Sequence, residues 1–177
     1  MIARSLATPR LRHRVVGVIL SPADLDFAIR MGKPPDLFEL RLDRFVGMID
    51  QLEKKVSRLS PPLVITARHP MEGGANRLSP LQRHNLLARF LPRARYVDIE
   101  LRSAPVFRSL LQVARKKNVQ RIISVHHLKR TPSPSAISFF MKLRAWKLRT
   151  PTHGTVAAGA AAASSIEHSL GSLFINQ

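Results

Sequence analysis

Short apolar runs of strand-like composition alternate with helical segments along most of this chain of 177 residues. Successive runs begin about 22 to 34 residues apart, which is the length of one strand followed by one helix. This alternation predicts a mostly parallel sheet, either an open doubly wound sheet or a barrel. The runs are residues 15–20 (VVGVIL), 37–42 (LFELRL), 62–67 (PLVITA), 96–101 (YVDIEL), 121–126 (RIISVH) and, less regular in pattern, 145–150 (AWKLRT).

The segments between these runs predict amphipathic helices. Apolar residues recur at helical spacing over residues 45–59 and again over residues 107–114, where the basic turn 115–117 follows as a helix end. Ser-Pro pairs are expected to begin three helices, because Ser caps the free backbone amides and Pro lacks one. These pairs lie at residues 21–22, 79–80 and 133–134.

The length and composition predict one domain in the cytoplasm. We expect residues 15–150 to form the β/α units, with a flexible basic leader at 1–14 and a divergent Ala-rich segment at 151–177. No apolar run is long enough to cross a bilayer, and the start has no apolar region typical of a secretion signal. The absence of cysteine excludes disulfides, thiolate nucleophiles and sulfur-ligated metals.

The formal net charge of +18 suggests nucleic acid as an alternative partner. However, most of the positive charges are scattered, and there is only one Tyr and one Trp for stacking beside the Phe residues. The asymmetry comes mainly from missing acids, since only Glu167 is acidic from Leu101 onward, against twelve Lys and Arg. Many of the remaining acids fall at strand ends, namely Glu39, Asp43, Asp98 and Glu100. This placement favours a polar site over a nucleic-acid surface.

Four successive strands end in charged or titratable residues. Side chains two residues apart share a face of a strand, and the carboxyl ends of barrel strands form the mouth where functional groups lie. Any one pair could be a buried ion pair of the core, but four together predict a polar pocket. The pairs are Glu39 and Arg41, Thr66 and Arg68, Asp98 and Glu100, and Ser124 and His126.

His126 and His127 are adjacent, so the same alternation separates them. If His126 shares the inward face of Ser124, His127 points outward, and the two rings cannot chelate one metal ion together. His126 near the strand-end carboxylates suits a general base with an orienting partner, although one His with carboxylates is also a metal-ligand set. We expect His126 to be the working residue and predict no metal.

These strand ends resemble the successive motifs of type I 3-dehydroquinate dehydratase. The four motifs occur in order, and the resemblance covers roughly residues 15–133. They are ELRLD (39–43), TARHPMEGG (66–74), VDIEL (97–101) and ISVHHLKRTPS (123–133). The resemblance implies a (β/α)8 TIM-barrel fold, here incomplete with about six βα units. It also implies removal of water from 3-dehydroquinate to give 3-dehydroshikimate, a step of aromatic amino acid biosynthesis, with neither metal nor cofactor.

The resemblance also implies roles for single residues. His126 corresponds to the general acid/base, and Glu72 and Asp98 correspond to the carboxylates that orient and tune it. Glu39, Arg41 and Arg68 correspond to the residues that bind the substrate. The family forms a Schiff base through a strand-six lysine, and its best match is Lys147, with Lys142 as the alternative. A protonated imine is an electron sink, so a His whose pKa is near neutrality can remove the proton from the neighbouring carbon.

The resemblance ends after residue 150. The last 27 residues offer no clear counterpart of the strand-seven Ser-Arg motif or of the late loop with Ser and Gln. Three hypotheses follow: a dehydratase with a shortened barrel end, a truncated inactive relative, or a basic β/α module that binds nucleic acid. Unpaired sheet edges would favour association, with a homodimer as one form.

Overall fold

The computed structural model describes residues 13–128, 133, 135, 138 and 171–173. Strands and helices alternate along residues 16–127, with short 3-10 helices in several connections. The strands are β1 (Val16–Ile19), β2 (Leu37–Arg41), β3 (Leu63–Thr66), β4 (Tyr96–Glu100), β5 (Gln120–His127) and β6 (Gly171–Leu173). The helices are α1 (Pro22–Arg30), α2 (Ile49–Val56), α3 (Pro80–Phe90) and α4 (Arg108–Lys116).

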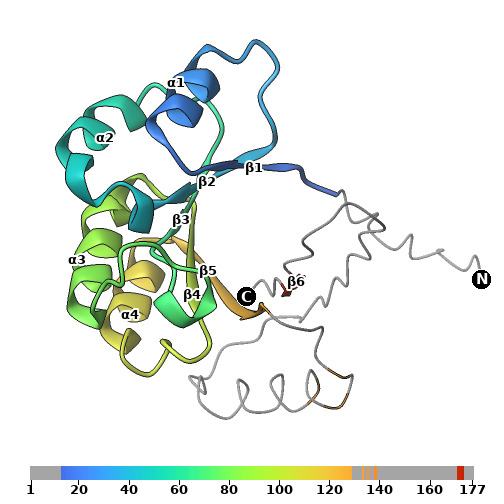
Figure 1. Cartoon of the computed structure of the whole chain (residues 1–177), viewed down its shortest axis with the longest axis vertical. Helices are drawn as coiled ribbons and strands as arrows, with labels where there is room; N and C mark the ends of the chain where they lie inside the picture. The colour runs from blue at the N-terminus through green and yellow to red at the C-terminus, as the bar shows by residue number, and fades with distance from the viewer. Residues whose placement is uncertain (1–12, 129–132, 134, 136–137, 139–170, 174–177) are drawn as a thin grey trace, which may run out of the picture.

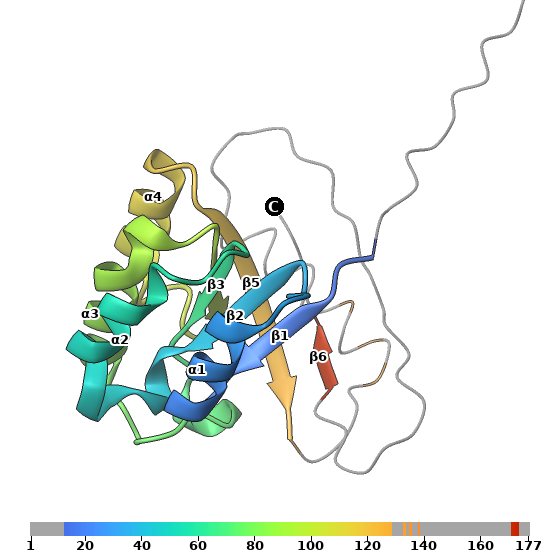
Figure 2. The same cartoon turned by 90° about the horizontal axis from the view of Figure 1, so that it is seen from above.

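Strands β1 to β5 form a parallel sheet in sequence order, as the alternating pattern predicts. All four helices cover one face of this sheet, which both views show (Figures 1 and 2). A doubly wound sheet would carry helices on both faces, so this arrangement is that of a β/α barrel section. The short β6 was not expected from the sequence. It pairs antiparallel with residues 125–127 of β5.

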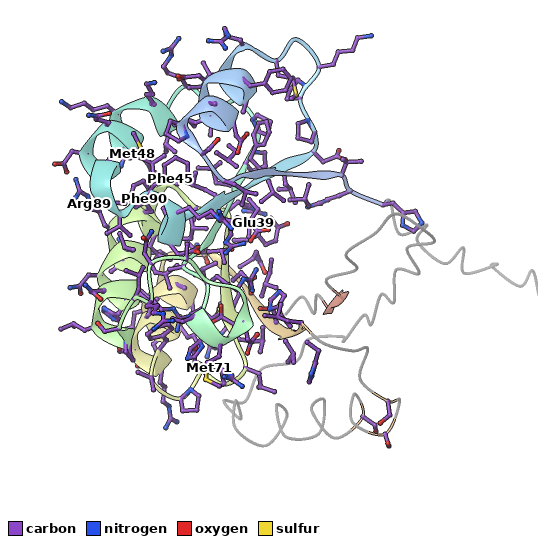
Figure 3. The ribbon with its side chains drawn as sticks, in the orientation of Figure 1. Glu39, Phe45, Met48, Met71, Arg89 and Phe90 are labelled. Carbon is purple, nitrogen blue, oxygen red and sulfur yellow. The ribbon has the colours of Figure 1, made fainter. Side chains whose placement is uncertain are left out.

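Alternation of side chains along the strands separates two apolar layers. The outward residues pack under the helices in the main core, including Phe38, Leu40, Ile65, Val97, Ile99 and Ile123. A small second cluster lies on the inward face, formed by Leu37, Val64, Tyr96 and Ile122. Further along the same inward face the residues become polar, so the sheet presents its charged side chains beyond an apolar floor. Figure 3 shows Glu39 on the face away from the helices and Phe45 on the helix side.

Two of the predicted Ser-Pro helix starts are confirmed. The Ser21 hydroxyl accepts a hydrogen bond from the Asp24 amide at the start of α1. Ser79 forms a full capping box with Gln82 at the start of α3. The third pair lies at the edge of the described residues, where Pro134 is outside them.

The helix expected over residues 45–59 is shorter than its apolar pattern. Phe45 is fully buried, but it lies between two 3-10 turns, Leu42–Arg44 and Val46–Met48, and α2 begins only at Ile49. The charged Asp43 is completely buried here, and its carboxylate accepts the backbone amide of Arg68 from a neighbouring loop. This contact holds the backbone around Asp43 in tight turns before α2 begins. The prediction of a helix at Phe45 was therefore wrong, although its burial was expected.

Candidate active site at the strand ends

Arg68 lies two residues after the end of β3, at the centre of the polar face. Its side chain is 5% exposed, and its Nη1 donates a hydrogen bond to the Ser124 hydroxyl over 3.1 Å. The same Nη1 lies 3.0 Å from Nδ1 of His126. Arg68 thus links the end of β3 to the end of β5.

Three buried carboxylates surround the guanidinium of Arg68. Its Nη2 donates to Glu39 Oε1 at 3.2 Å and lies 3.1 Å from Asp98 Oδ2, while Nη1 lies 3.7 Å from Glu100 Oε1. Burial lowers the pKa of Arg68, but the charges of Asp98, Glu39, Glu100 and the nearby Glu72 outweigh it, and the net pKa is raised. Arg68 is therefore a permanent cation that allows acids to be buried together.

Glu72 holds His126 from the loop after β3. Its Oε2 lies 3.0 Å from His126 Nδ1 and accepts the His126 backbone amide, also at 3.0 Å. Burial raises the pKa of Glu72, but these hydrogen bonds and the charges of His126 and Arg102 outweigh it and hold the pKa below its ordinary value. Glu72 is thus an ionised acceptor in contact with the imidazole.

The surroundings of His126 favour the tautomer with the proton on Nδ1. A bare Nδ1 would face the Glu72 carboxylate with two acceptors in contact, whereas a protonated Nδ1 donates a charge-assisted hydrogen bond to it. Arg68 Nη1, which can only donate, also lies 3.0 Å from this Nδ1, but it has the Ser124 hydroxyl as its acceptor. Nε2 of His126 is buried with no hydrogen-bond partner among the described residues, and an orphaned acceptor is less costly than an orphaned N–H. Its lone pair is therefore available to take a proton.

Asp43 anchors the same loop from the other side. Arg41 binds its carboxylate through Nε and Nη2, at 3.0 and 2.9 Å. The backbone amides of Arg68 and Ala75 donate to it as well, so both ends of the intervening loop are fixed to one residue. Burial raises the pKa of Asp43, but the hydrogen bonds from Arg41 and from the Ala75 and Arg68 amides, with the charge of Arg41, hold it below its ordinary value.

Glycines allow this loop to fold tightly. Gly73 adopts a left-handed conformation with φ of 85°, which glycine accepts without strain. A Cβ on Gly74 would lie 2.1 Å from the carbonyl oxygen of Arg68, so only glycine fits there. The loop after β3 is therefore folded back onto the strand ends and held by Asp43.

Arg83 and Glu100 form a second buried pair behind Arg68. The Arg83 side chain is 2% exposed, and it donates to the Ala67 carbonyl, to the Ser103 hydroxyl and to Glu100. Glu100 in turn accepts the backbone amide of His69 at 2.8 Å. Glu100 thus positions the start of the loop that carries Glu72.

Asp98 is buried on the inward face of β4. Burial raises its pKa to about 6, despite the opposing charge of Arg68. Neither of its oxygens accepts a well-aligned hydrogen bond from the described residues, and the same holds for the buried hydroxyl of Thr66. Buried polar groups are normally hydrogen-bonded. The Thr66 hydroxyl and His126 Nε2, beside the Asp98 carboxylate that pairs with Arg68, therefore mark the part of the inward face that is suited to a polar ligand.

Replacing Asp98 with Asn is expected to change how the free energy of unfolding depends on pH. The pKa of the native carboxyl is about 6, against an ordinary value of 3.8. Between these values the folded protein keeps a proton that the unfolded chain has released, so this stabilisation is complete below 3.8 and is lost as the pH rises through 6. Asn cannot ionise. The stability of the original protein relative to Asp98→Asn should therefore fall by roughly 2 to 3 kcal/mol from about pH 4 to about pH 7.

Urea unfolding at several pH values measures this difference directly. A stability difference that stays constant with pH would show that the pKa of Asp98 is not raised.

The structure brings most of the predicted site residues together. Six of the seven lie within the described residues. Arg68 contacts Glu39, Asp98 and His126, and Glu72 contacts His126. Arg41 is connected to this group through Asp43. Lys147 and its alternative Lys142 lie outside the described residues, as do the expected strand 145–150 and most of the leader. Within the described residues, no group of three or more His, Asp and Glu is arranged to hold a metal ion.

The family model for Type I 3-dehydroquinase matches residues 23–147, which is more than half of the chain. The chain belongs to the type I 3-dehydroquinase family. Its motifs at β2, β3, β4 and β5 all lie within the matched range, and so do the described site residues.

Two curated relatives, both 3-dehydroquinate dehydratases, match this chain over only part of their own length. The 3-dehydroquinate dehydratase of Thermococcus gammatolerans is 37% identical over 101 residues, covering 55% of this chain and 44% of that protein. The 3-dehydroquinate dehydratase of Methanobrevibacter smithii is 29% identical over 111 residues, covering 62% and 48%. The chain spans about half the length of the curated relatives it matches.

A solved structure of a 3-dehydroquinate dehydratase supports the fold. The 3-dehydroquinate dehydratase from Enterococcus faecalis superposes with a TM-score of 0.61 at 25% identity, over 74% of this chain and 62% of that one. The prediction of an α/β fold of the TIM-barrel type is confirmed.

No helix among the described residues is long and apolar enough to span a membrane.

Three residues that shape this site were not assigned a role from the sequence. Asp43 lies within the ELRLD motif, which could have identified it. Arg83 lies in the middle of α3 and Arg102 in the loop after β4, and neither belongs to a motif. Their roles depend on contacts between distant segments, which no local pattern reveals.

Proposed function

We propose that this chain dehydrates 3-dehydroquinate to 3-dehydroshikimate through a lysine Schiff base, as a step of the shikimate pathway in the cytoplasm. The observation that carries the proposal is the free Nε2 of His126, which Glu72 orients through Nδ1. The buried Thr66 hydroxyl, which has no hydrogen bond among the described residues, and the Asp98 carboxylate, which pairs with Arg68, lie on the same inward face. Membership of the family supports the same substrate.

In this proposal Lys147 supplies the amine. It condenses with the substrate ketone, releases water and forms an imine that is protonated on nitrogen, and the positive charge of this protonated imine draws electrons from the neighbouring carbon. His126 Nε2 removes a proton from that carbon, and the C–H electrons form an enamine. The enamine then expels the hydroxyl one carbon further on, which takes the proton from His126 and leaves as water. Hydrolysis of the remaining imine releases 3-dehydroshikimate and restores the lysine.

The charged groups near His126 divide into two roles. Glu72 and Asp98 orient the imidazole and tune its surroundings. Glu39, Arg41 and Arg68 bind the hydroxyls and the ring of the substrate. Arg68 has most of its donors committed to protein acceptors, so it can also hold its neighbours in place before substrate arrives.

This organisation assigns the catalytic units to residues 15–150, flanked by the leader at 1–14 and by residues 151–177. It requires neither a metal nor a cofactor.

A turnover assay tests the proposal. The full chain is incubated with 3-dehydroquinate, and the conjugated product is followed by its ultraviolet absorbance and identified by mass spectrometry. We expect saturable formation of 3-dehydroshikimate. A folded chain that gives no product above the uncatalysed rate would contradict the proposal and favour an inactive relative.

A further inference from the structure

Arg102 lies in the loop after β4, directly beside Glu72. Its Nε is 3.0 Å from Glu72 Oε1, and its Nη1 is 3.3 Å from the sulfur of Met71. Arg102 therefore contacts two consecutive residues of the 3-10 helix Pro70–Glu72, which places Glu72 at the strand ends. Neither the motifs nor the proposed mechanism uses Arg102.

The two oxygens of Glu72 have different partners. Oε2 accepts the backbone amide and faces Nδ1 of His126, while Oε1 pairs with Arg102. The carboxylate is 5% exposed, whereas Arg102 is 45% exposed. A carboxylate that is held at both oxygens cannot rotate about its last torsion without breaking an interaction. Arg102 therefore restrains the plane of the carboxylate from the solvent side.

We propose that Arg102 is a positioning residue that holds Glu72 in the orientation needed to keep the proton of His126 on Nδ1. Its significance for catalysis rests on the proposed function. Without Arg102, Oε1 has no other partner among the described residues, and the carboxylate can turn away from the imidazole. The contact that keeps the proton on Nδ1, and so leaves Nε2 unprotonated, is then lost.

Other charges also face Glu72 and remain when Arg102 is removed. Arg68 lies on the β3 side of His126, and His69 begins the loop. Both interact with Glu72 through space, and His126 contacts it directly. Because Arg102 is half exposed, solvent weakens its charge effect, and we expect a moderate change that decreases with added salt.

The test compares Arg102→Met and Arg102→Lys by NMR. Met keeps most of the aliphatic stem but lacks the charge, and Lys keeps the charge. Arg115→Met is the matched control for net charge, because Arg115 is exposed at the far end of α4. The measurements are the 15N shifts of the His126 ring, which report its tautomer, and a 13C titration of the Glu72 carboxyl.

We expect Arg102→Met to lower the share of the Nδ1–H tautomer and to raise the pKa of Glu72 by about 0.5 to 1 pH unit at low salt. Arg102→Lys should recover at least about half of both changes, and Arg115→Met should leave both unchanged. Identical 15N shifts in Arg102→Met and the original protein would overturn the proposal, as would an equal change in Arg115→Met.

These measurements need no turnover, so they separate this proposal from the proposed function. If the tautomer shifts as expected in a chain that forms no product, the positioning role stands and the proposed function fails. If product forms but the tautomer is unchanged in Arg102→Met, the proposed function stands and the positioning role fails. In an active chain, kcat for Arg102→Met should fall about 3- to 10-fold with a smaller change in KM.

Discussion

Replacing His126 with Gln should lower kcat for the proposed dehydration of 3-dehydroquinate by about 10²- to 10⁴-fold. Gln retains a polar side chain of similar size but cannot take up a proton, so both proton transfers lose their carrier. The effect should fall on kcat more than on KM, because the reaction needs the base in the transition state and not for binding. Steady-state kinetics on the purified, folded variant measures it.

His127 offers a matched control on the adjacent residue. Its side chain lies on the other side of the strand backbone from that of His126. His127→Gln should keep kcat within about threefold of the original. If the two variants lose activity equally, the assignment of a single working histidine is wrong.

Replacing Arg68 with Met should destabilise the fold by about 3 to 5 kcal/mol. The guanidinium is the shared countercharge of Glu39, Asp98 and Glu100, all of which are buried. Removing it leaves acids that must either stay charged in a medium of low polarity or take up protons, and both cost free energy. Urea unfolding followed by circular dichroism measures the loss.

Arg89→Met is the control for Arg68→Met, since Arg89 also pairs with two acids, Asp50 and Glu53, but is 42% exposed on α3. It should cost much less than Arg68→Met, because solvent screens exposed ion pairs. Adding Asp98→Asn to Arg68→Met should restore part of the stability, because it removes one of the unpaired charges. Equal losses in Arg68→Met and Arg89→Met would show that the buried cluster does not depend on Arg68.

Hydrophobic periodicity was sufficient to predict the parallel sheet. Each of the first five apolar runs became a strand within one residue or so of its expected bounds, because buried parallel strands need continuous apolar and β-branched residues. The pattern was less informative about turns. It could not separate Phe45 from α2, since a residue in a tight 3-10 turn can face the same core as the helix that follows.

The site was predictable to the extent that it follows strand alternation. Glu39, Asp98 and His126 lie on the inward face because each is an even number of residues from another inward residue of its strand. Glu72 required the family resemblance, because its place depends on the folded loop. Arg83 and Arg102 required the structure, since they act through partners 17 and 30 residues away.

Trapping with borohydride tests the central claim most directly. Borohydride reduces an imine to a stable amine, so a chain that forms a Schiff base becomes permanently linked to the substrate. The full chain is treated with 3-dehydroquinate and borohydride, digested and mapped by mass spectrometry, with Lys147→Met as the matched variant. We expect one substrate-derived adduct on Lys147 that is absent from Lys147→Met. A folded chain without an adduct on any lysine would contradict the Schiff-base mechanism.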